Sequence, residues 1–215
     1  MIYEMRFYNK KSDWTNENDL YVVVWETDDK KPVVNGNVRG KLLSCLGYGA
    51  KTYEVPEGID TIGAGAFFKS EWDYFECSIE KLVIPASVVK IEEGAFEFTY
   101  INKIQIHSDS PAGVVKNKGL YTKDGSTLLW VLGANGTGEY KVPEGVKRIG
   151  RAAFDVSEID TLILPSTIEE IYYNKEEDYQ YDGLTIKAPE NSYAQTFAKK
   201  HGIPFETIEE NEQHK

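Results

Sequence analysis

The chain has 215 residues and a formal net charge of −11, with 41% hydrophobic, 13% aromatic and 27% charged residues. This is the composition of a soluble globular protein, long enough for one domain or for a solenoid of several small units. The acidic balance argues against nucleic acid or an anionic membrane as the partner, because both are recognised by clusters of Lys and Arg.

The N-terminal region predicts two strands that pair as a hairpin. Residues 2–8 alternate with the period of two that is typical of a strand. Residues 20–25 (L-Y-V-V-V-W) are β-branched and aromatic and predict the second strand. We expect residues 1–32 to form a β cap on the first coil of a solenoid. The alternative is that Trp14 and Trp25 form a recognition surface.

Two longer stretches of the chain resemble each other. Residues 39–59 and 124–146 align with one residue of gap, and each ends in a Tyr-x-Val-Pro-Glu-Gly sequence. Each copy precedes a shorter repeat, which is the pattern of a repeat protein.

The shorter repeat predicts stacked coils. Each copy contains a strand-ending Pro, apolar residues at every third position, and then a small residue, Ala and Phe. Pro ends the strand because it cannot donate to the ladder. We expect Ala to be small where neighbouring coils pack and Phe to fill the centre of a coil, so the coils must stack to bury a core. Copies follow Pro56, Pro85, Pro143 and Pro165, with strands of the form L-x-x-L-x-L at 79–84, 101–106 and 159–164 and a shortened one at 184–186.

Two further elements are expected in the second half. Asp124-Gly125, between two apolar runs, predicts a β-hairpin at residues 119–132 that interrupts the array. Ser192 followed by Gln195 predicts the start of a helix, and Gly202 predicts its end. Residues 188–215 are therefore expected to form a helical cap and an acidic tail.

These motifs resemble the BspA-type leucine-rich repeat. The resemblance is carried by V-P-E-G-V-x-x-I-G-x-x-A-F and the following I-x-x-L-x-L-P, by the hairpin G-L-Y-T-K-D-G-S-T-L-L, and by the closing S-Y-A-Q-T-F-A-K-K-H-G-I-P-F. It covers roughly residues 33–205, and residues 33–187 form the expected repeat array. The resemblance implies a right-handed leucine-rich-repeat solenoid, rich in strands with short helical turns. It also implies a binding or adhesion role, often on the surface of host-associated bacteria and some protozoa, and it supplies no set of catalytic residues to transfer to this chain.

The location and the cysteines remain open at this point. The N-terminus has no basic segment followed by an apolar one, so the sequence favours a cytoplasmic protein. The resemblance implies the cell surface, if a leader has been removed. Cys45 and Cys77 allow a single bridge or two reduced thiols, and the second interpretation is favoured.

Candidate chemistry is sparse. The three His residues have no metal-ligand spacing to another His or Cys, and no phosphate-binding or nucleophile motif is present. Asn174, Glu176 and Asp178 alternate as in a Ca²⁺ loop but lack its Gly and closing Glu, so we expect a solvated acidic segment. The sequence therefore predicts a protein that is not an enzyme and has no metal or cofactor.

Aromatic residues outside the repeat positions are the candidate interaction residues, because surplus exposed aromatics are typical of binding patches. The alternative is that they cover the side of a neighbouring coil. The leading hypothesis is a protein-interaction module with an unidentified protein partner and an oligomeric state left open. The second is a spacer segment of a larger adhesin, and a remote third is an enzyme with an unrecognised site. The candidates are Trp72, Tyr74 and Phe75 in an insertion at 68–76, and Tyr172, Tyr173, Tyr179 and Tyr181 in an acidic loop.

Overall fold

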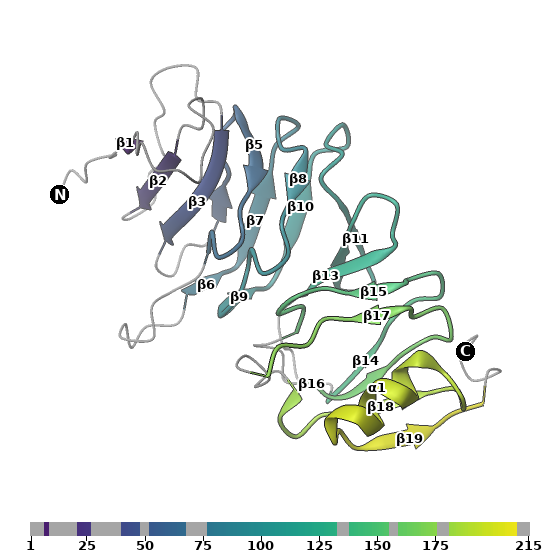
Figure 1. Ribbon diagram of the computed structural model, residues 1–215. Helices are drawn as coiled ribbons and strands as arrows, with labels where there is room; N and C mark the ends of the chain where they lie inside the picture. Colours follow the sequence, from purple (N-terminus) through teal and green to yellow (C-terminus); the bar gives the residue numbers. More distant parts are fainter. Residues whose placement is uncertain are drawn as a thin grey trace.

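A computed structural model describes residues 7–8, 21–26, 40–47, 52–67, 77–132, 138–154, 159–175 and 181–209. These residues form short strands that stack into a β-solenoid of about five turns, with little helix (Figure 1). Among them, no helix is long and apolar enough to cross a bilayer.

The strands follow one another at short intervals along the chain. The first ten are β1 (Phe7–Tyr8), β2 (Tyr21–Glu26), β3 (Gly40–Gly47), β4 (Thr52–Glu54), β5 (Ile59–Ile62), β6 (Cys77–Ile79), β7 (Lys81–Ile84), β8 (Lys90–Ile91), β9 (Thr99–Ile101) and β10 (Ile104–Ile106). The others are β11 (Val114–Lys116), β12 (Gly119–Tyr121), β13 (Thr127–Val131), β14 (Gly138–Lys141), β15 (Arg148–Ile149), β16 (Ile159–Ile163), β17 (Glu170–Ile171), β18 (Thr185–Ala188) and β19 (Phe205–Thr207). The helix α1 covers Tyr193–His201 and lies between β18 and β19 along the chain.

The solenoid has two halves of the same design, as the internal duplication predicts. In the first half, the parallel ladders β3-β5-β8 and β4-β7-β10 form two walls, and β6 pairs with β9. In the second half, β13-β15-β17 and β14-β16-β18 repeat the two walls in the same order. Each step along a wall is one coil of the chain.

The Pro turns work as the sequence predicts. Pro143 O accepts a hydrogen bond from Val146 N at 3.4 Å, and Gly145 between them has φ +87°, which only Gly adopts at little cost. In the next coil the Gly is replaced by Thr167, whose hydroxyl accepts from Gly145 N at 3.2 Å and donates to Val146 O at 2.7 Å. The hydroxyl thus ties two successive turns together. Ser87 accepts from Gly58 N in the same way in the first half, at 3.1 Å.

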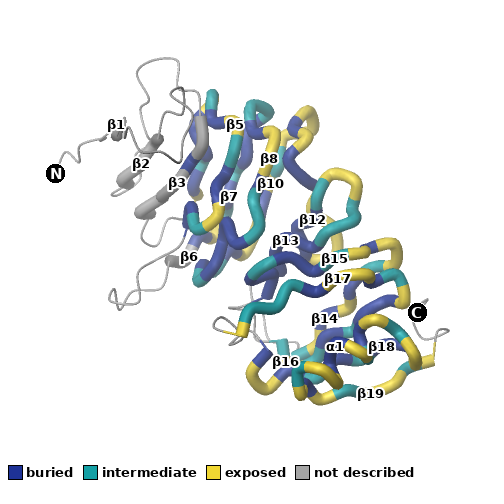
Figure 2. The backbone as a smooth tube through the Cα atoms, in the orientation of Figure 1, coloured by how far each residue is buried: buried dark blue, intermediate teal, exposed yellow. Residues whose placement is uncertain are grey.

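The Ala-Phe pairs are buried in all three copies, which confirms their expected place in the core. Ala66, Ala95 and Ala153 are at most 1% exposed. The aromatic rings follow one another along the solenoid, and Figure 2 shows buried residues running through both halves. Ring centroids lie 5.7 Å apart for Tyr53 and Phe67, 5.3 Å for Phe67 and Phe96, and 6.0 Å for Phe96 and Trp130.

The expected hairpin at residues 119–132 is present, since β12 pairs antiparallel with β13 around Gly125, which has φ +74°. Its relation to the array differs from the prediction. Because β13 also forms a parallel ladder with β15, the hairpin begins the second half and does not interrupt the array. It serves both halves: Leu120, Leu129 and Trp130 pack in the first core, and Tyr121, Leu128 and Val131 pack in the second.

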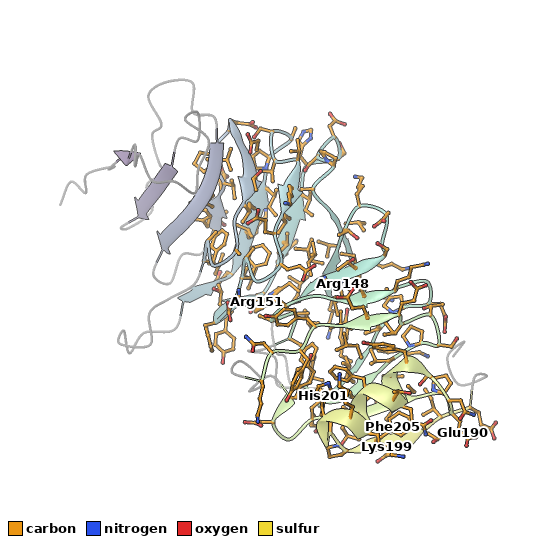
Figure 3. All side chains as sticks on the ribbon, viewed as in Figure 1. Arg148, Arg151, Glu190, Lys199, His201 and Phe205 are labelled. Atoms are coloured by element: carbon orange, nitrogen blue, oxygen red, sulfur yellow. The ribbon has the colours of Figure 1, made fainter. Side chains whose placement is uncertain are left out.

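Ion pairs also connect the halves. Arg148 and Arg151 lie on and just after β15, close to the boundary (Figure 3). Arg148 pairs with Glu93, and Arg151 Nη2 lies 3.0 Å from Glu97 Oε2. Glu93 also accepts a hydrogen bond from the backbone N of Arg151 at 3.1 Å. The two carboxylates come from the first half and both guanidinium groups from the second.

The N-terminal end of the array has paired strands, and the C-terminal end has a helix. At the N-terminal end, β1 pairs antiparallel with β2, and β2 continues in parallel onto β3. At the other end, Ser192 Oγ accepts a hydrogen bond from Gln195 N at 3.2 Å, and Gly202 ends α1 with φ +71°. The Gln195 side chain accepts from Asn191 N at 2.8 Å, one residue before the position that a capping box uses. After α1, β19 adds in parallel to β18.

Candidate interaction cleft

A cleft lies where the wall formed by β13, β15 and β17 meets the helix. Strand β17 ends at Ile171, and the chain continues through Tyr172 and Tyr173. Among the described residues, β17 is the last strand of its sheet, so α1 packs where a further coil would otherwise add a strand. The two elements enclose an open cleft of about 500 Å³.

One stripe of the helix forms a side of this cleft. Its members recur at intervals of three and four positions, which places them on a single helical face. Ala194 and Ala198 lie on the neighbouring face and are fully buried against the core, which fixes the rotation of the helix. The stripe consists of Tyr193, Thr196, Phe197, Lys200 and His201, and it faces Glu170, Ile171, Tyr172 and Tyr173.

Aromatic rings make up most of the lining. The Tyr173 ring lies 3.7 Å from the His201 ring, centroid to centroid, and 5.9 Å from the Phe197 ring in an edge-to-face arrangement. The Tyr193 ring is stacked on Phe197 at 6.5 Å and is 41% exposed. Such rings offer apolar area at a small cost in conformational entropy, which is why they are enriched in binding surfaces.

Tyr181 supports the cleft from below. It is 6% exposed, and its ring lies 5.7 Å from Phe154 and 5.8 Å from Phe197. Its hydroxyl donates to the backbone carbonyl of Tyr172. Burial raises the pKa of Tyr181 well above its ordinary value, so the hydroxyl keeps its proton. The side chain therefore links the helix, the repeat core and the Tyr172 backbone.

The charged groups around the cleft differ in whether they have an ion-pair partner. Glu170 Oε2 lies 3.0 Å from Arg148 Nε, and because Arg148 also pairs with Glu93, the charge of Glu170 is partly compensated. Lys200 is exposed, and within the described part of the chain no ion pair engages it. Burial, and secondly the charge of Lys200, lowers the pKa of His201 below its ordinary 6.5. At neutral pH the His201 ring is therefore largely uncharged and acts as another aromatic surface.

The predicted interaction residues lie in different surroundings. Tyr172 and Tyr173 line the cleft, whereas Tyr181 is buried beneath it and offers no free surface. Trp72, Tyr74, Phe75 and Tyr179 lie outside the described residues. Sequence reasoning missed the helical stripe. Its spacing from Tyr193 to His201 was visible in the sequence, but only the pairing of α1 with β17 shows that the stripe faces Tyr173.

Other candidate chemistry finds little support in the structure. In the part of the chain that is described, no three His, Cys, Asp or Glu residues are grouped so as to hold a metal ion. The expected Ca²⁺-like alternation is described only at Asn174, because Glu176 and Asp178 fall outside. His107 lies in an exposed turn, where its Nδ1 accepts from Asp109 N at 3.2 Å.

Comparisons with known proteins agree with this architecture. The family described as BspA type leucine rich repeat region matches residues 71–112 and 135–198, in six copies. A leucine-rich repeat protein from Eubacterium ventriosum superimposes with a TM-score of 0.53 at 22% identity, over 66% of this chain and 36% of that one. The chain thus spans about a third of the length of that protein, and the likeness concerns the fold alone.

A second solved structure, the pneumococcal vaccine antigen PcpA, aligns with a TM-score of 0.41 at 12% identity, over 74% of this chain and 68% of that one. No curated protein matches the chain.

Proposed function

The chain carries BspA-type leucine-rich repeats, and from this premise we propose that it is a non-enzymatic protein-interaction module whose contact site is the cleft between β17 and α1. Repeat scaffolds of this kind are typical of protein-interaction and adhesion modules. The repeat positions themselves build the core, so a partner must be recognised by side chains outside them.

One observation carries the proposal: aromatic side chains surplus to the repeat gather around an open cleft at the end of the array. Tyr193 is 41% exposed, and Tyr172 and Tyr173 are half-buried beside it. Exposed aromatics gathered around a pocket are the usual centres of binding energy in protein interfaces. In this proposal β19 and α1 close the C-terminal end of the core, and the β1–β2 pair closes the other end.

A comparison of captured proteins tests the proposal. The wild-type chain, Tyr193→Ala and Val89→Ala are immobilised and exposed to extracellular-matrix extracts and to bacterial-cell extracts. Val89 is 55% exposed in the first half and serves as the matched surface control. We expect a partner that the wild type and Val89→Ala retain and that Tyr193→Ala loses. Equal capture by all three proteins would contradict the proposal and favour a spacer role.

A further inference from the structure

Among the described residues, most of the lining of the cleft consists of uncharged aromatic rings, and the ammonium group of Lys200 has no ion-pair partner. These two features together indicate the chemistry of a ligand. Within the described part of the lining, Glu170 has the one carboxylate, and it lies 3.0 Å from Arg148. The ammonium group of Lys200, on the opposite side of the cleft, is free of ion pairs among the described residues. In a chain whose net charge is −11, the cleft is thus a local site for an anionic group.

The lining also needs an apolar or aromatic group from the ligand. Tyr193 presents an exposed ring, and Thr196, one turn along the same stripe, is exposed beside it. A volume of about 500 Å³ lies within the usual range for ligand sites and accommodates a few amino-acid residues. An aromatic side chain can pack on Tyr193 while a carboxylate close to it in the same peptide reaches Lys200.

The charge of Lys200 can also stabilise the end of the helix, and the test must distinguish this role from ligand binding. Lys199 and Lys200 both lie in the last turn of α1, where positive charge is favoured by the helix dipole. Only Lys200 lines the cleft. Lys199 is therefore a matched control, since it has the same charge and the same relation to the helix end.

We infer that the partner presents an extended peptide segment in which an aromatic side chain is flanked by carboxylates. Lys200 pairs with a carboxylate of this segment, and the aromatic ring packs on Tyr193. This inference rests on the proposed function. Neutral sugars are a different class of ligand and would gain nothing from the Lys200 charge.

The sequence of the chain itself supplies a probe with this chemistry. A synthetic peptide S-E-W-D-Y-F-E, with the sequence of residues 70–76, is compared with S-Q-W-N-Y-F-Q, in which the three carboxylates become amides. Binding to the full chain is followed by NMR chemical shifts. We expect shifts at Tyr193, Thr196 and Lys200, and about fivefold tighter binding of the acidic peptide, the factor that one partly screened ion pair supplies. Lys200→Gln should abolish that preference, and Lys199→Gln should keep it.

Several results would overturn the inference: no binding of either peptide at millimolar concentration, equal binding of both, or a preference that Lys200→Gln leaves intact. Binding of cellotetraose at the cleft without peptide binding would assign the site to sugars. The experiments distinguish a failure of this inference from a failure of the proposed contact site. If Tyr193→Ala still loses its captured partner while the peptides show no charge preference, the cleft remains the contact site and the peptide chemistry is wrong.

Discussion

The ion pair between Arg151 and Glu97 should contribute clearly to stability, because one of its partners is buried. The Glu97 side chain is 8% exposed, whereas the Arg151 side chain is 34% exposed, and their closest atoms lie 3.0 Å apart. Arg151→Met keeps the apolar stem and removes the charge, so the carboxylate of Glu97 loses this partner inside the boundary between the halves. Breaking a fully buried pair costs about 3–5 kcal/mol and an exposed one about 0–1 kcal/mol. With one partner partly exposed, we expect a loss of about 2 kcal/mol.

Urea unfolding followed by circular dichroism measures this cost. Lys147→Met is the matched control, since Lys147 and Glu169 lie 2.9 Å apart but are both more than half exposed, and we expect it to cost much less than Arg151→Met because water screens the pair. Glu97→Gln and the double variant complete a cycle, in which the double variant should cost less than the sum of the single ones. A cost for Arg151→Met no greater than that of Lys147→Met, or strict additivity in the cycle, would show that the burial of Glu97 does not strengthen this ion pair.

Three further expectations follow from packing, capping and titration. Ala153→Leu should destabilise the protein by about 1–3 kcal/mol in urea unfolding, because the fully buried site has no room for three more carbons; a neutral outcome would show that the coils can separate. Ser192→Ala should cost about 1 kcal/mol through the lost cap of α1, and an unchanged unfolding midpoint would exclude that role. Because the pKa of His201 is lowered in the fold, its contribution to stability is present above pH 6.5 and is lost as the pH falls below 6.5 and through the lower pKa of the folded state. An NMR titration of His201 should therefore have its midpoint below 6.5, and a midpoint at or above 6.5 would contradict the burial argument.

Much of the fold could be predicted because its determinants are local. Pro143 and Gly145 specify a turn through their own backbone preferences, and the Ala-Phe pair follows at a fixed distance in each copy. Asp124-Gly125 specified a hairpin for the same reason. The sequence could not show that β13 would also pair with β15, since that ladder joins residues 21 positions apart.

The repeat pattern did not reveal the backbone conformation of one position in each copy. The residue before each Ala-Phe pair has a left-handed conformation, with φ +67° at Gly65, +71° at Gly94 and +51° at Ala152. Two copies use Gly, for which this conformation costs little, and the third uses Ala at some cost in backbone strain. The pattern alone indicated only that the position is small.

The cleft was predicted in part. Tyr172 and Tyr173 stood out because they exceed the needs of the core. Tyr181 stood out for the same reason, although its ring is buried, because a sequence does not distinguish a surplus aromatic at the surface from one that fills the end of the core. The helical stripe lines the cleft because α1 packs against β17. This packing depends on contacts between segments that are distant in the chain, so the sequence did not reveal it.

Site-specific photocrosslinking shows whether a bound partner lies at the cleft. A photoreactive amino acid is placed at Thr196, which is exposed and lines the cleft, or at Val89, which is exposed in the other half. Each protein is irradiated with the extract from which the wild type captures a partner. We expect a covalent adduct from position 196 and none from position 89. Adducts from position 89 alone, or from neither position while the partner is still captured, would contradict it.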